Sequence, residues 1–351
     1  MSRCEALARE LCAIPSVTGD ERACADAIER RLRATRYEVT RVDESVLARS
    51  PRTGRPLVLL VGHTDTVPGK PGDGPVRVVG DRLFGLGASD MKGGLAVMVA
   101  LAEDLDPAAL AYDVGFVFYD REEGPWADSG LGPVLDHVPW LKEAALAFCL
   151  EPSDNVVQVG CMGSMHARVR FVGRSAHSAR PWQGENAIHA AAPLLARLAA
   201  RAPVDVERDG HVFREVVSAT QAQGGTARNV IPDRFELNLN YRFAPGRSLE
   251  EAEAELRALV GEGPEVDFVE RAPAGRVVGR NALLQRFLAL NGNAVAAKQA
   301  WTDVARLGQA GVDAVNLGPG LAAQAHQAGE WASLALLEES YAQFRRFLTA
   351  G

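Results

Sequence analysis

Three unbroken apolar runs set the fold class of this 351-residue chain. They are LVLLV at 57–61, VGFVFY at 114–119 and ALAFCL at 145–150. Strands buried on both faces read as continuous apolar runs, whereas a strand with one wet face alternates. Helical periodicity occurs around these runs, at 3–13, 20–34 and about 92–105. This alternation predicts an α/β domain with a mainly parallel sheet and helices on both faces.

The pattern changes near residue 161. Alternating segments follow, with two helical segments between them: MHARVRFVG, REVVSATQAQGG, RFELNLNYRF and EVDFVE. The order β-α-β-β-α-β is that of a ferredoxin-like α+β unit with a sheet that is wet on one face. The α/β pattern returns after about residue 272 and ends in an amphipathic helix from Glu330. We therefore expect a discontinuous domain over 1–162 and 272–351, with a second domain inserted over 163–271.

Composition excludes several classes of protein. Apolar residues make up 47% and charged residues 24%, which is typical of soluble globular proteins. A net charge of −7 argues against a general nucleic-acid binder. No apolar run approaches the ~18 residues of a membrane span, and the N-terminal segment lacks the pattern of a signal peptide. Five cysteines without a CxxC pair predict reduced thiols and a cytoplasmic location.

Histidine and carboxylate side chains follow each of the three apolar runs. His63 comes after the first run, Glu122 and Glu123 after the second, and Glu151 after the third. The carboxyl ends of parallel strands meet at one edge of a sheet, where ligands bind. Because neighbouring side chains on an extended segment point opposite ways, one glutamate can face a metal and the other a water molecule.

Two more donors complete the set. Asp90 lies in the glycine-rich turn GLGASDMKGG, and His326 lies in AHQAGE. Two histidines and three carboxylates suit two divalent cations, with one carboxylate to spare as a base. Asp65, two residues after His63, can accept the second imidazole N–H and fix the metal-binding tautomer. The set predicts a two-metal hydrolase.

Each donor also has an ordinary interpretation when taken alone. His63 could be a surface histidine, Asp90 a helix N-cap and EEG a solvated acidic turn. Glu330 is interpreted as a first-turn acid of the closing helix rather than a ligand. The combination of all the donors at predicted strand ends favours the metal site.

The chain resembles the co-catalytic zinc metallopeptidases and deacylases over essentially its whole length. That family includes aminoacylases, acetylornithine deacetylase, carboxypeptidase G-like enzymes and succinyl-diaminopimelate desuccinylase. The resemblance is carried by GHTDTVP, GLGASDMKGG, EEG, EP, GRSAHSARP, GENAIHAAA, GGTARNVIPD, YRFAPG, WTDVARL, NLGPG and AHQAGE. Within the family, WTDVAR, SARPWQGENAIH and FAPGRS look most like the desuccinylases.

The resemblance implies a role for each metal donor. His63 and Glu151 would bind one zinc ion, and Glu123 and His326 would bind the other. Asp90 would bridge the two ions. Two Zn²⁺ per chain are expected, with Co²⁺ or Mn²⁺ able to substitute.

The resemblance also implies the catalytic residues. Glu122 would be the general base and Asp65 the partner of His63. The family often has a cis peptide after the bridging aspartate, here Asp90–Met91. The inserted domain would act as a lid and form a homodimer, and its His177 would stabilise the oxyanion in the partner's site. A loop histidine without such a role is the alternative for His177.

Residues for the substrate follow from the same motifs. Arg242 and Asn229 match positions that hold the substrate carboxylate, and Arg is suited to this by bidentate pairing. The other candidates are Arg180, Arg228, Thr302 and Gly320. Many desuccinylases carry an Arg-rich segment where this chain has Cys161-Met162-Gly163-Ser164. That departure removes a source of positive charge for a second substrate carboxylate.

The expected substrate is a small N-acyl amino acid, with N-succinyl-LL-2,6-diaminopimelate preferred. The nearest alternative is an N-acetyl-amino-acid deacetylase acting on ornithine, lysine or citrulline. A dipeptidase or carboxypeptidase of the same family stays open. A non-catalytic binding protein is disfavoured because all five ligand positions and the base are present.

Overall fold

The structure is a computed structural model that describes residues 1–350 and divides into two compact units. Unit 1 contains residues 1–160 and 278–296 and the chain from Asp303 onward. Unit 2 contains residues 161–277 and 297–302. The chain therefore leaves unit 1, forms most of unit 2, and returns.

Unit 1 is built on an eight-stranded mixed sheet. In spatial order its strands are β1 (Glu38–Val42), β2 (Ser45–Arg49), β6 (Asp113–Tyr119), β3 (Leu57–His63), β7 (Leu146–Cys149), β17 (Ala314–Asn316), β8 (Val157–Val159) and β16 (Val295–Ala297). The central strands β6, β3, β7 and β17 are parallel. Every residue of β3, β6 and β7 is buried, so the prediction of strands with both faces covered is confirmed.

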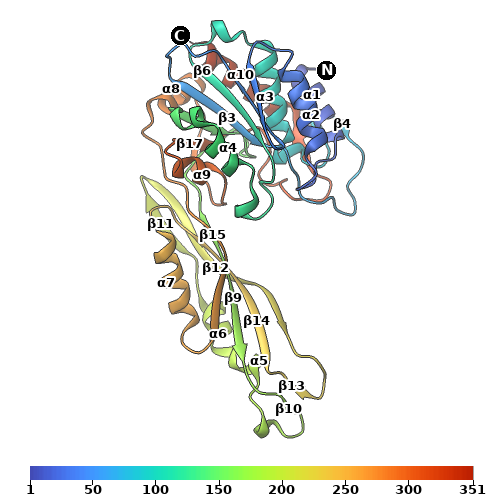
Figure 1. The fold of residues 1–351 in the computed structure, drawn as a ribbon, viewed down its shortest axis with the longest axis vertical. Helices are drawn as coiled ribbons and strands as arrows, with labels where there is room; N and C mark the ends of the chain where they lie inside the picture. The colour runs from blue at the N-terminus through green and yellow to red at the C-terminus, as the bar shows by residue number, and fades with distance from the viewer. Residues whose placement is uncertain (351) are drawn as a thin grey trace. The chain divides into compact units, whose positions relative to one another are not determined.

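Helices cover this sheet. They are α1 (Arg3–Ala13), α2 (Arg22–Leu32), α3 (Gly93–Asp104), α4 (Leu131–His137), α8 (Ala282–Asn291), α9 (Val304–Gln309) and α10 (Leu334–Thr349). The sequence of α3 is apolar all round, and its residues from Gly93 to Ala102 are buried. Such a helix needs neighbours on every side. It has them, because α1, α2 and α10 pack around it (Figure 1).

Two glycines let the two helical layers approach the sheet closely. A Cβ on Gly62 of β3 would lie 2.6 Å from the Cε atom of Met91 and 2.7 Å from Leu95 Cδ2 of α3. A Cβ on Gly115 of β6 would lie 2.7 Å from the ring of Trp140. Gly115 is paired with Leu59, three residues before Gly62, so the two glycines face opposite sides of the sheet. Helical segments thus pack on both faces.

A separate three-stranded sheet joins distant parts of unit 1. Its order is β18 (Trp331–Ser333), β5 (Arg82–Phe84) and β4 (Arg77–Val79). The pairing of Trp331 with Phe84 brings the segment before β18 next to the segment after β5. This contact matters below, because Asp90 follows β5 and His326 precedes β18.

Unit 2 contains a five-stranded antiparallel sheet. In spatial order its strands are β11 (Val204–Arg208), β12 (His211–Gly224), β14 (Arg234–Phe243), β9 (Gly163–Val172) and β15 (Glu265–Ala272). Its helices are α5 (Ala187–Ala190), α6 (Ala192–Ala200) and α7 (Leu249–Val260). The chain order β9, α5–α6, β12, β14, α7, β15 is the ferredoxin-like order predicted from the sequence.

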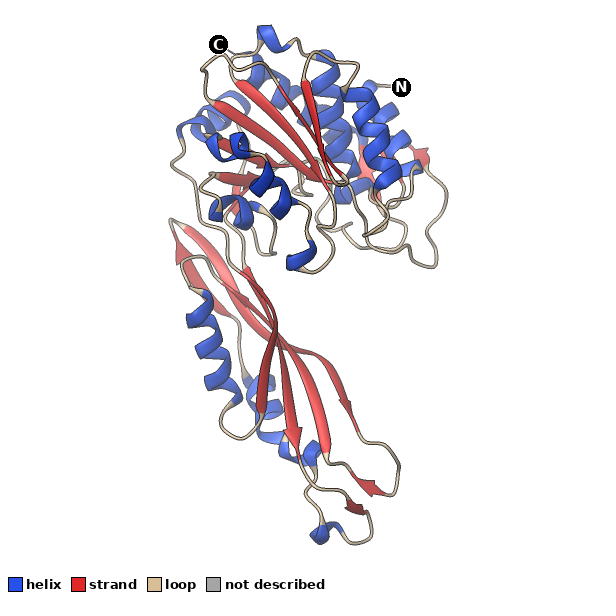
Figure 2. Cartoon of the chain, in the orientation of Figure 1, coloured by secondary structure: helices blue, strands red, loops and turns tan. Residues whose placement is uncertain are grey.

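The alternation along β14 explains how unit 2 forms its core. Leu237, Leu239 and Tyr241 are buried and belong to a cluster that includes Leu194 of α6 and Leu256 of α7. The residues between them are polar and only partly buried. The helices lie along one side of the long strands (Figure 2). One face of this sheet is therefore the core and the other is polar, as the sequence predicted.

Three details differ from the sequence analysis. The main part of unit 2 runs from Cys161 to Val277, whereas the inserted domain was expected over 163–271. Residues 297–302 belong to unit 2 rather than to the larger domain. They do so because Ala300 O accepts a hydrogen bond from Met162 N, and the Gln299 side chain bonds to the backbone of Val212 and Arg214. The closing helix α10 begins at Leu334, not at Glu330, and the Ser333 side chain caps it by accepting from Leu336 N.

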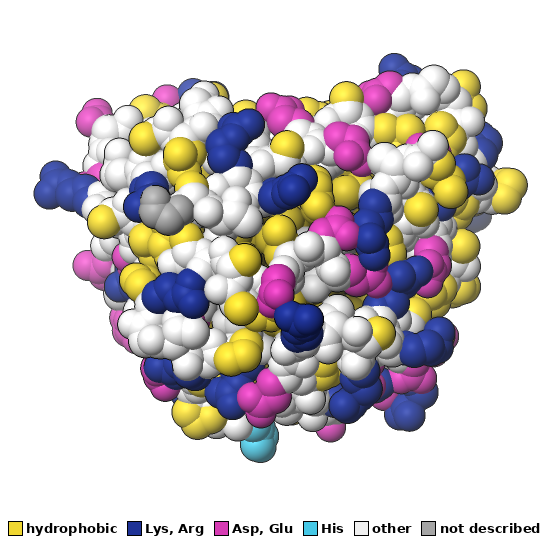
Figure 3. All heavy atoms as spheres, turned by 90° about the horizontal axis from the view of Figure 1, so that it is seen from above, with side chains coloured by type: hydrophobic (Ala, Val, Ile, Leu, Met, Phe, Trp, Pro, Cys, Tyr) yellow, Lys and Arg dark blue, Asp and Glu magenta, His cyan; other side chains and the backbone are white. Residues whose placement is uncertain are grey.

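The face of the molecule in Figure 3 carries basic and acidic side chains interspersed among apolar ones. The net charge of −7 is therefore not gathered into one acidic patch on that face. Among residues 1–350, no helix combines the length and apolarity needed to cross a bilayer.

Candidate metal centre and active site

The histidine and carboxylate side chains singled out in the sequence meet at the carboxyl ends of the central strands of unit 1. His63 is the last residue of β3, and Glu151 lies two residues after β7. Glu122 and Glu123 follow β6. The other two donors come from the segment Ala88–Lys92, which precedes α3, and from the loop before β18.

His63, Asp90 and Glu151 form a first group of donors, whose atoms lie within 4.8 Å of one another. The His63 Nε2 atom is 3.2 Å from Asp90 Oδ1 and 4.0 Å from Glu151 Oε1. The three side chains are 1%, 12% and 7% exposed, in that order. This first trio is a nearly buried set of one nitrogen and two carboxylates.

Asp90, Glu123 and His326 form a second trio with the same spacing limit of 4.8 Å. His326 Nε2 is 2.9 Å from Glu123 Oε1 and 3.6 Å from Asp90 Oδ2. The two carboxylate oxygens of Asp90 thus face different histidines. The geometry places Asp90 between the two trios.

The protonation behaviour of both histidines reflects the negative charge around them. Burial alone would lower the pKa of His63, but hydrogen bonds to Asp65 and Asp90 raise it well above its usual value. The hydrogen bond to Glu123 raises the pKa of His326, and nearby Asp90 adds to this. The carboxylates that raise these pKa values would also attract a bound cation, which would compete with the protons for the imidazole nitrogens.

Asp65 is fully buried and contacts other residues in addition to His63. The His63 Nδ1 atom lies 3.0 Å from the Asp65 carbonyl oxygen and 3.4 Å from its Oδ1. The carboxylate oxygens accept the backbone N–H groups of Glu122 and Glu123, each at 3.0 Å, and the Thr18 hydroxyl at 2.9 Å. One side chain therefore fixes both the His63 imidazole and the loop that carries both glutamates.

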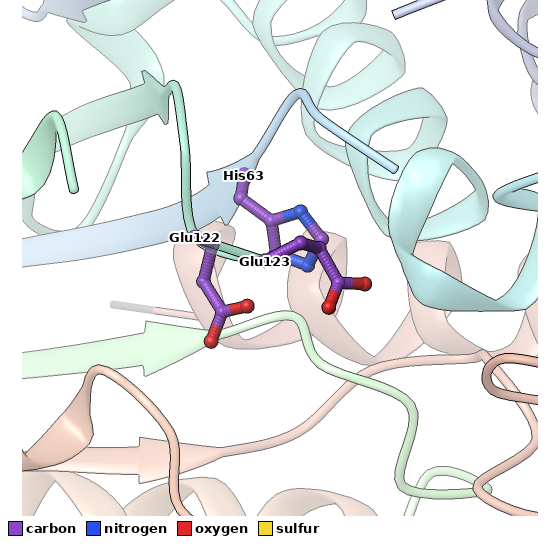
Figure 4. A group of neighbouring side chains, drawn as sticks. All are labelled: His63, Glu122 and Glu123. Carbon is purple, nitrogen blue, oxygen red and sulfur yellow. The ribbon is translucent and has the colours of Figure 1, made fainter. Parts of the chain in front are cut away.

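Glu122 and Glu123 leave this loop in different directions. Figure 4 shows their carboxylates diverging beside the imidazole of His63. Burial, with the nearby Glu151 carboxylate, raises the pKa of Glu122 well above its ordinary value. A carboxyl group with raised proton affinity beside a candidate metal centre is suited to move protons.

Backbone geometry at the site is unusual in three places, one of which is Arg121, directly before Glu122, with a φ of 59°. The Asp90–Met91 peptide bond is cis, as the resemblance led us to expect. His326 has a positive φ of 60°, which few residues other than glycine adopt.

Glu330 and Gly320 also contact the Asp90 segment, and neither role was apparent from the sequence. Glu330 lies just before β18, where it is 3% exposed and accepts hydrogen bonds from three backbone N–H groups of that segment. Burial raises its pKa to about 7. A Cβ on Gly320 would lie 2.0 Å from Ser89 O, so the absence of a side chain allows close packing there. The Ser333 cap was the sequence signal that α10 starts after Glu330.

The candidate residues in unit 2 fall into two groups. His177, Arg180, Arg228 and Asn229 are exposed and lie around the short pairing of β10 (Ala176–His177) with β13 (Val230–Ile231). Asn229 O accepts from Ser178 N, and His177 Nδ1 accepts from Ala179 N. This group lies near the first residue of β14, whereas Arg242 is near the last.

Arg242 occupies a different environment. Its Nε donates to Asn240 Oδ1 at 3.0 Å, and burial lowers its pKa. It lines a groove of about 540 Å³ with Arg214, Gln299 and two valines. Thr302 also belongs to unit 2, where it is buried and its carbonyl accepts from Cys161 Sγ. One copy of unit 2 therefore does not bring Arg242 together with Arg180 and Arg228.

The sequence is similar to those of known protein families and relatives. A model of the M20 peptidase dimerisation domain matches residues 159–267, and a model of peptidase family M28 matches residues 45–167. The chain is 35% identical over 352 residues to succinyl-diaminopimelate desuccinylase of Corynebacterium glutamicum, which covers 98% of this chain and 95% of that one. It is 39% identical over 339 residues to a Mycobacterium tuberculosis protein named as a candidate enzyme of the same kind, with 95% of each chain covered.

The chain belongs to the M20 family. Solved structures agree with the fold. An aminopeptidase from Bacillus cereus has a TM-score of 0.80 at 17% identity, covering 99% of this chain and 97% of that one. A dinuclear metal-binding M20 peptidase from Bacillus subtilis has a TM-score of 0.70 at 18% identity, covering 98% and 96%. At these identities the likeness extends to the fold, and M20 membership marks the chain as an amide hydrolase.

Proposed function

We propose that this M20 enzyme uses two zinc ions to release succinate from N-succinyl-LL-2,6-diaminopimelate. The observation that carries the metal chemistry is the pair of donor trios that share Asp90. The substrate rests on similarity to proteins named desuccinylases along nearly the full chain.

The donor set fits two zinc ions. His63, Asp90 and Glu151 would hold one ion, and Asp90, Glu123 and His326 the other. Imidazole nitrogen and carboxylate oxygen are ordinary zinc ligands. Because carboxylates outnumber histidines and no thiolate takes part, Co²⁺ or Mn²⁺ should be able to substitute.

The chain's own residues supply the proton transfers. Metal ions bound there would lower the pKa of a water molecule and polarise the amide carbonyl. Glu122 accepts the proton of the attacking water and donates it to the leaving amine nitrogen. Its raised proton affinity suits it to hold that proton between the two steps. Asp65 keeps Glu122 in place through the backbone bond at Glu122 N.

The assembly we propose is a homodimer formed through unit 2. The match to a dimerisation domain over residues 159–267 supports it. His177 is exposed in unit 2. We propose that it enters the site of the other subunit and stabilises the oxyanion of the tetrahedral intermediate.

Arginine side chains in unit 2 would hold the substrate carboxylates. Arg242 of one subunit would pair with the amino-acid carboxylate, and the other subunit would supply Asn229 to assist it and Arg180 or Arg228 to pair with the distal carboxylate of the succinyl group. We propose a cytoplasmic location, which the five free and buried cysteines support because thiols stay reduced there.

An N-acetyl-amino-acid deacetylase is the second candidate, and one observation favours it. The segment Cys161–Ser164 contains no basic residue, so it offers no positive charge to a distal carboxylate. An acetyl group needs none.

The test is a comparison of substrates. Zinc-loaded enzyme is given N-succinyl-diaminopimelate, N-acetylornithine, N-acetylcitrulline and a dipeptide, and kcat/KM is measured for each. We expect kcat/KM to be at least ~10-fold higher for the succinyl compound. A tenfold difference corresponds to about 1.4 kcal/mol, which we attribute to pairing of the distal carboxylate with one arginine. Preference for an acetylated amino acid would favour the second candidate instead.

A further inference from the structure

Glu330 is a buried carboxylate that the proposed reaction does not use. It is 3% exposed and lies outside both donor trios. Its Oε2 atom accepts a hydrogen bond from Gly87 N at 2.9 Å, and its Oε1 atom accepts from Ser89 N at 2.7 Å and Asp90 N at 2.9 Å. One side chain thus binds the backbone of the segment that carries the shared ligand.

The backbone around Glu330 adds further contacts to the same segment. Gly85 N donates to Glu330 O at 3.1 Å, and the Ser89 hydroxyl donates to Trp331 O at 2.8 Å. Trp331 is paired with Phe84 between β18 and β5. The backbone of Glu330 and Trp331 is therefore hydrogen-bonded to residues 85–90 in addition to the Glu330 side chain.

Glu330 also lies four residues after His326 on the same segment. That segment is held to a second loop, because Gly329 N donates to Asp73 Oδ1 at 2.8 Å and Lys70 Nζ donates to His326 O. The hydrogen bond from Asp90 N to Glu330 is therefore a short connection between the ligand shared by both trios and the histidine of the second trio.

We propose that Glu330 is a positioning residue for the metal centre. It holds the backbone of Gly87–Asp90 so that the two carboxylate oxygens of Asp90 face the two histidines. It acts through Asp90 and does not touch the substrate. The inference rests on the proposed function to the extent that Asp90 bridges two ions. Partners of metal ligands typically contribute 10–100-fold to metal affinity.

The substitution Glu330→Gln removes the charge and one of the two acceptor oxygens at nearly constant size. Glutamine keeps the size of the side chain and can still accept at one oxygen, but its amide nitrogen would face either Gly87 N–H or the N–H groups of Ser89 and Asp90. The segment must then move to relieve that contact. Glu330→Asp keeps the charge and shortens the side chain by one methylene group.

Asp113 offers a matched control in the same unit. It is 1% exposed, and its carboxylate accepts hydrogen bonds from the backbone N–H and the hydroxyl of Thr53. It is the first residue of β6, at the opposite end of that strand from Glu122 and Glu123. Asp113→Asn disturbs a buried, hydrogen-bonded carboxylate away from the metal donors.

The experiment measures zinc binding to the full-length, metal-free chain, by competition with a chromophoric chelator, and the absorption spectrum of the cobalt-loaded protein. Glu330→Gln should weaken binding of at least one of the two Zn²⁺ ions by ~10–100-fold and change the cobalt spectrum. Glu330→Asp should weaken it in the same direction. Asp113→Asn should lower thermal stability and leave zinc affinity within twofold of wild type.

Zinc affinity within twofold of wild type in either folded Glu330 variant would overturn the proposal. So would failure of both variants to fold while Asp113→Asn folds, because Glu330 would then be a residue of the fold rather than of the metal centre. The wild-type protein separates this from the proposed function. If wild type binds two zinc ions but does not hydrolyse the succinyl substrate, only the proposed substrate is wrong.

Discussion

At the scale of single residues, the two adjacent glutamates after β6 give the sharpest test of the proposed chemistry. Glu122→Ala should retain zinc and lose at least ~100-fold in kcat, because a general base typically contributes 10²–10⁴-fold. Glu123→Ala should instead lose zinc, since its Oε1 lies in the second trio with His326. Zinc content by elemental analysis and kcat for each variant check this. The opposite pattern would mean that the two roles are exchanged.

The sequence identified these donors because each follows a recognisable apolar strand. It could not assign the contacts of Asp65 and Glu330, whose partners are backbone N–H groups. Every residue except proline carries such a group, so no side-chain pattern marks the donor. The sequence predicts Glu330 to be a first-turn helix acid because an amphipathic helix follows it closely. The Ser333 cap, three residues later, shows where that helix begins.

At the scale of elements, α9 holds the far side of the loop that carries the proposed base. The Arg306 guanidinium donates to Asp303 Oδ1 at 2.9 Å and to Trp126 O at 2.6 Å, and it lies 3.5 Å from the Trp126 ring centre. Trp126 follows Glu122 by four residues. Arg306 therefore fixes one end of this loop, while Asp65 fixes the other.

Arg306→Lys should lower kcat by roughly 10-fold and leave zinc content unchanged. Lysine keeps the charge but loses the planar stacking and the paired donors. Steady-state kinetics and elemental analysis check this. Arg286→Lys, on the exposed side of α8 where Arg286 bonds to Ala350 O, is the control and should behave as wild type. An unchanged kcat in Arg306→Lys would show that the loop does not depend on α9.

A pH dependence of stability belongs to the elements of unit 2. Burial alone would raise the pKa of Glu255 on α7, but hydrogen bonds from Tyr241 at 2.9 Å and Arg201 at 2.6 Å lower it. A lowered folded-state pKa stabilises the fold above the unfolded value of about 4.3, and this stabilisation is lost as pH falls through the folded value.

Glu255→Gln should therefore lower the unfolding temperature at pH 7, and the difference from wild type should shrink below about pH 4. Thermal unfolding of both proteins from pH 3 to pH 7 measures this. A difference that stays constant over that range would indicate that lost packing, rather than the charge, is responsible.

Elements were predictable where they were long. The five-residue and longer apolar or alternating runs gave most of the central strands of both sheets. Strands β4, β5, β8, β16 and β18 have three residues each, too few to show a period of two. Yet β5 and β18 join the Asp90 and His326 segments. Sequence periodicity therefore could not predict that the Asp90 and His326 segments lie together, because this depends on the short pairing of β5 with β18.

At the scale of the whole molecule, the proposed homodimer can be tested by mixing inactive subunits. Glu122→Ala and His177→Ala should each have little activity alone. In a mixed dimer, one site has an intact Glu122 and receives the partner's intact His177. Activity should return to about one quarter of wild type after complete random exchange, since half the dimers are mixed and each has one working site.

Subunit exchange is verified by native mass spectrometry of differently tagged chains. His177→Ala alone should fall ~100- to 1,000-fold in kcat, as is usual for loss of an oxyanion donor. No recovery in verified mixed dimers would show that His177 does not act between subunits.

The sequence could not show that residues 297–302 belong to unit 2. Hydrogen bonds from residues far away in the chain, rather than a local sequence pattern, hold that segment there.

The most direct test of the central proposal is a zinc titration of the metal-free enzyme with N-succinyl-diaminopimelate as substrate. Succinate release is followed as Zn²⁺ is added, and bound zinc is measured in the same samples. The two trios that share Asp90 predict that activity reaches its plateau when two zinc ions are bound per chain. Succinate release that does not depend on zinc, or a chain with two bound zinc ions that releases none, would contradict the proposed two-zinc desuccinylase.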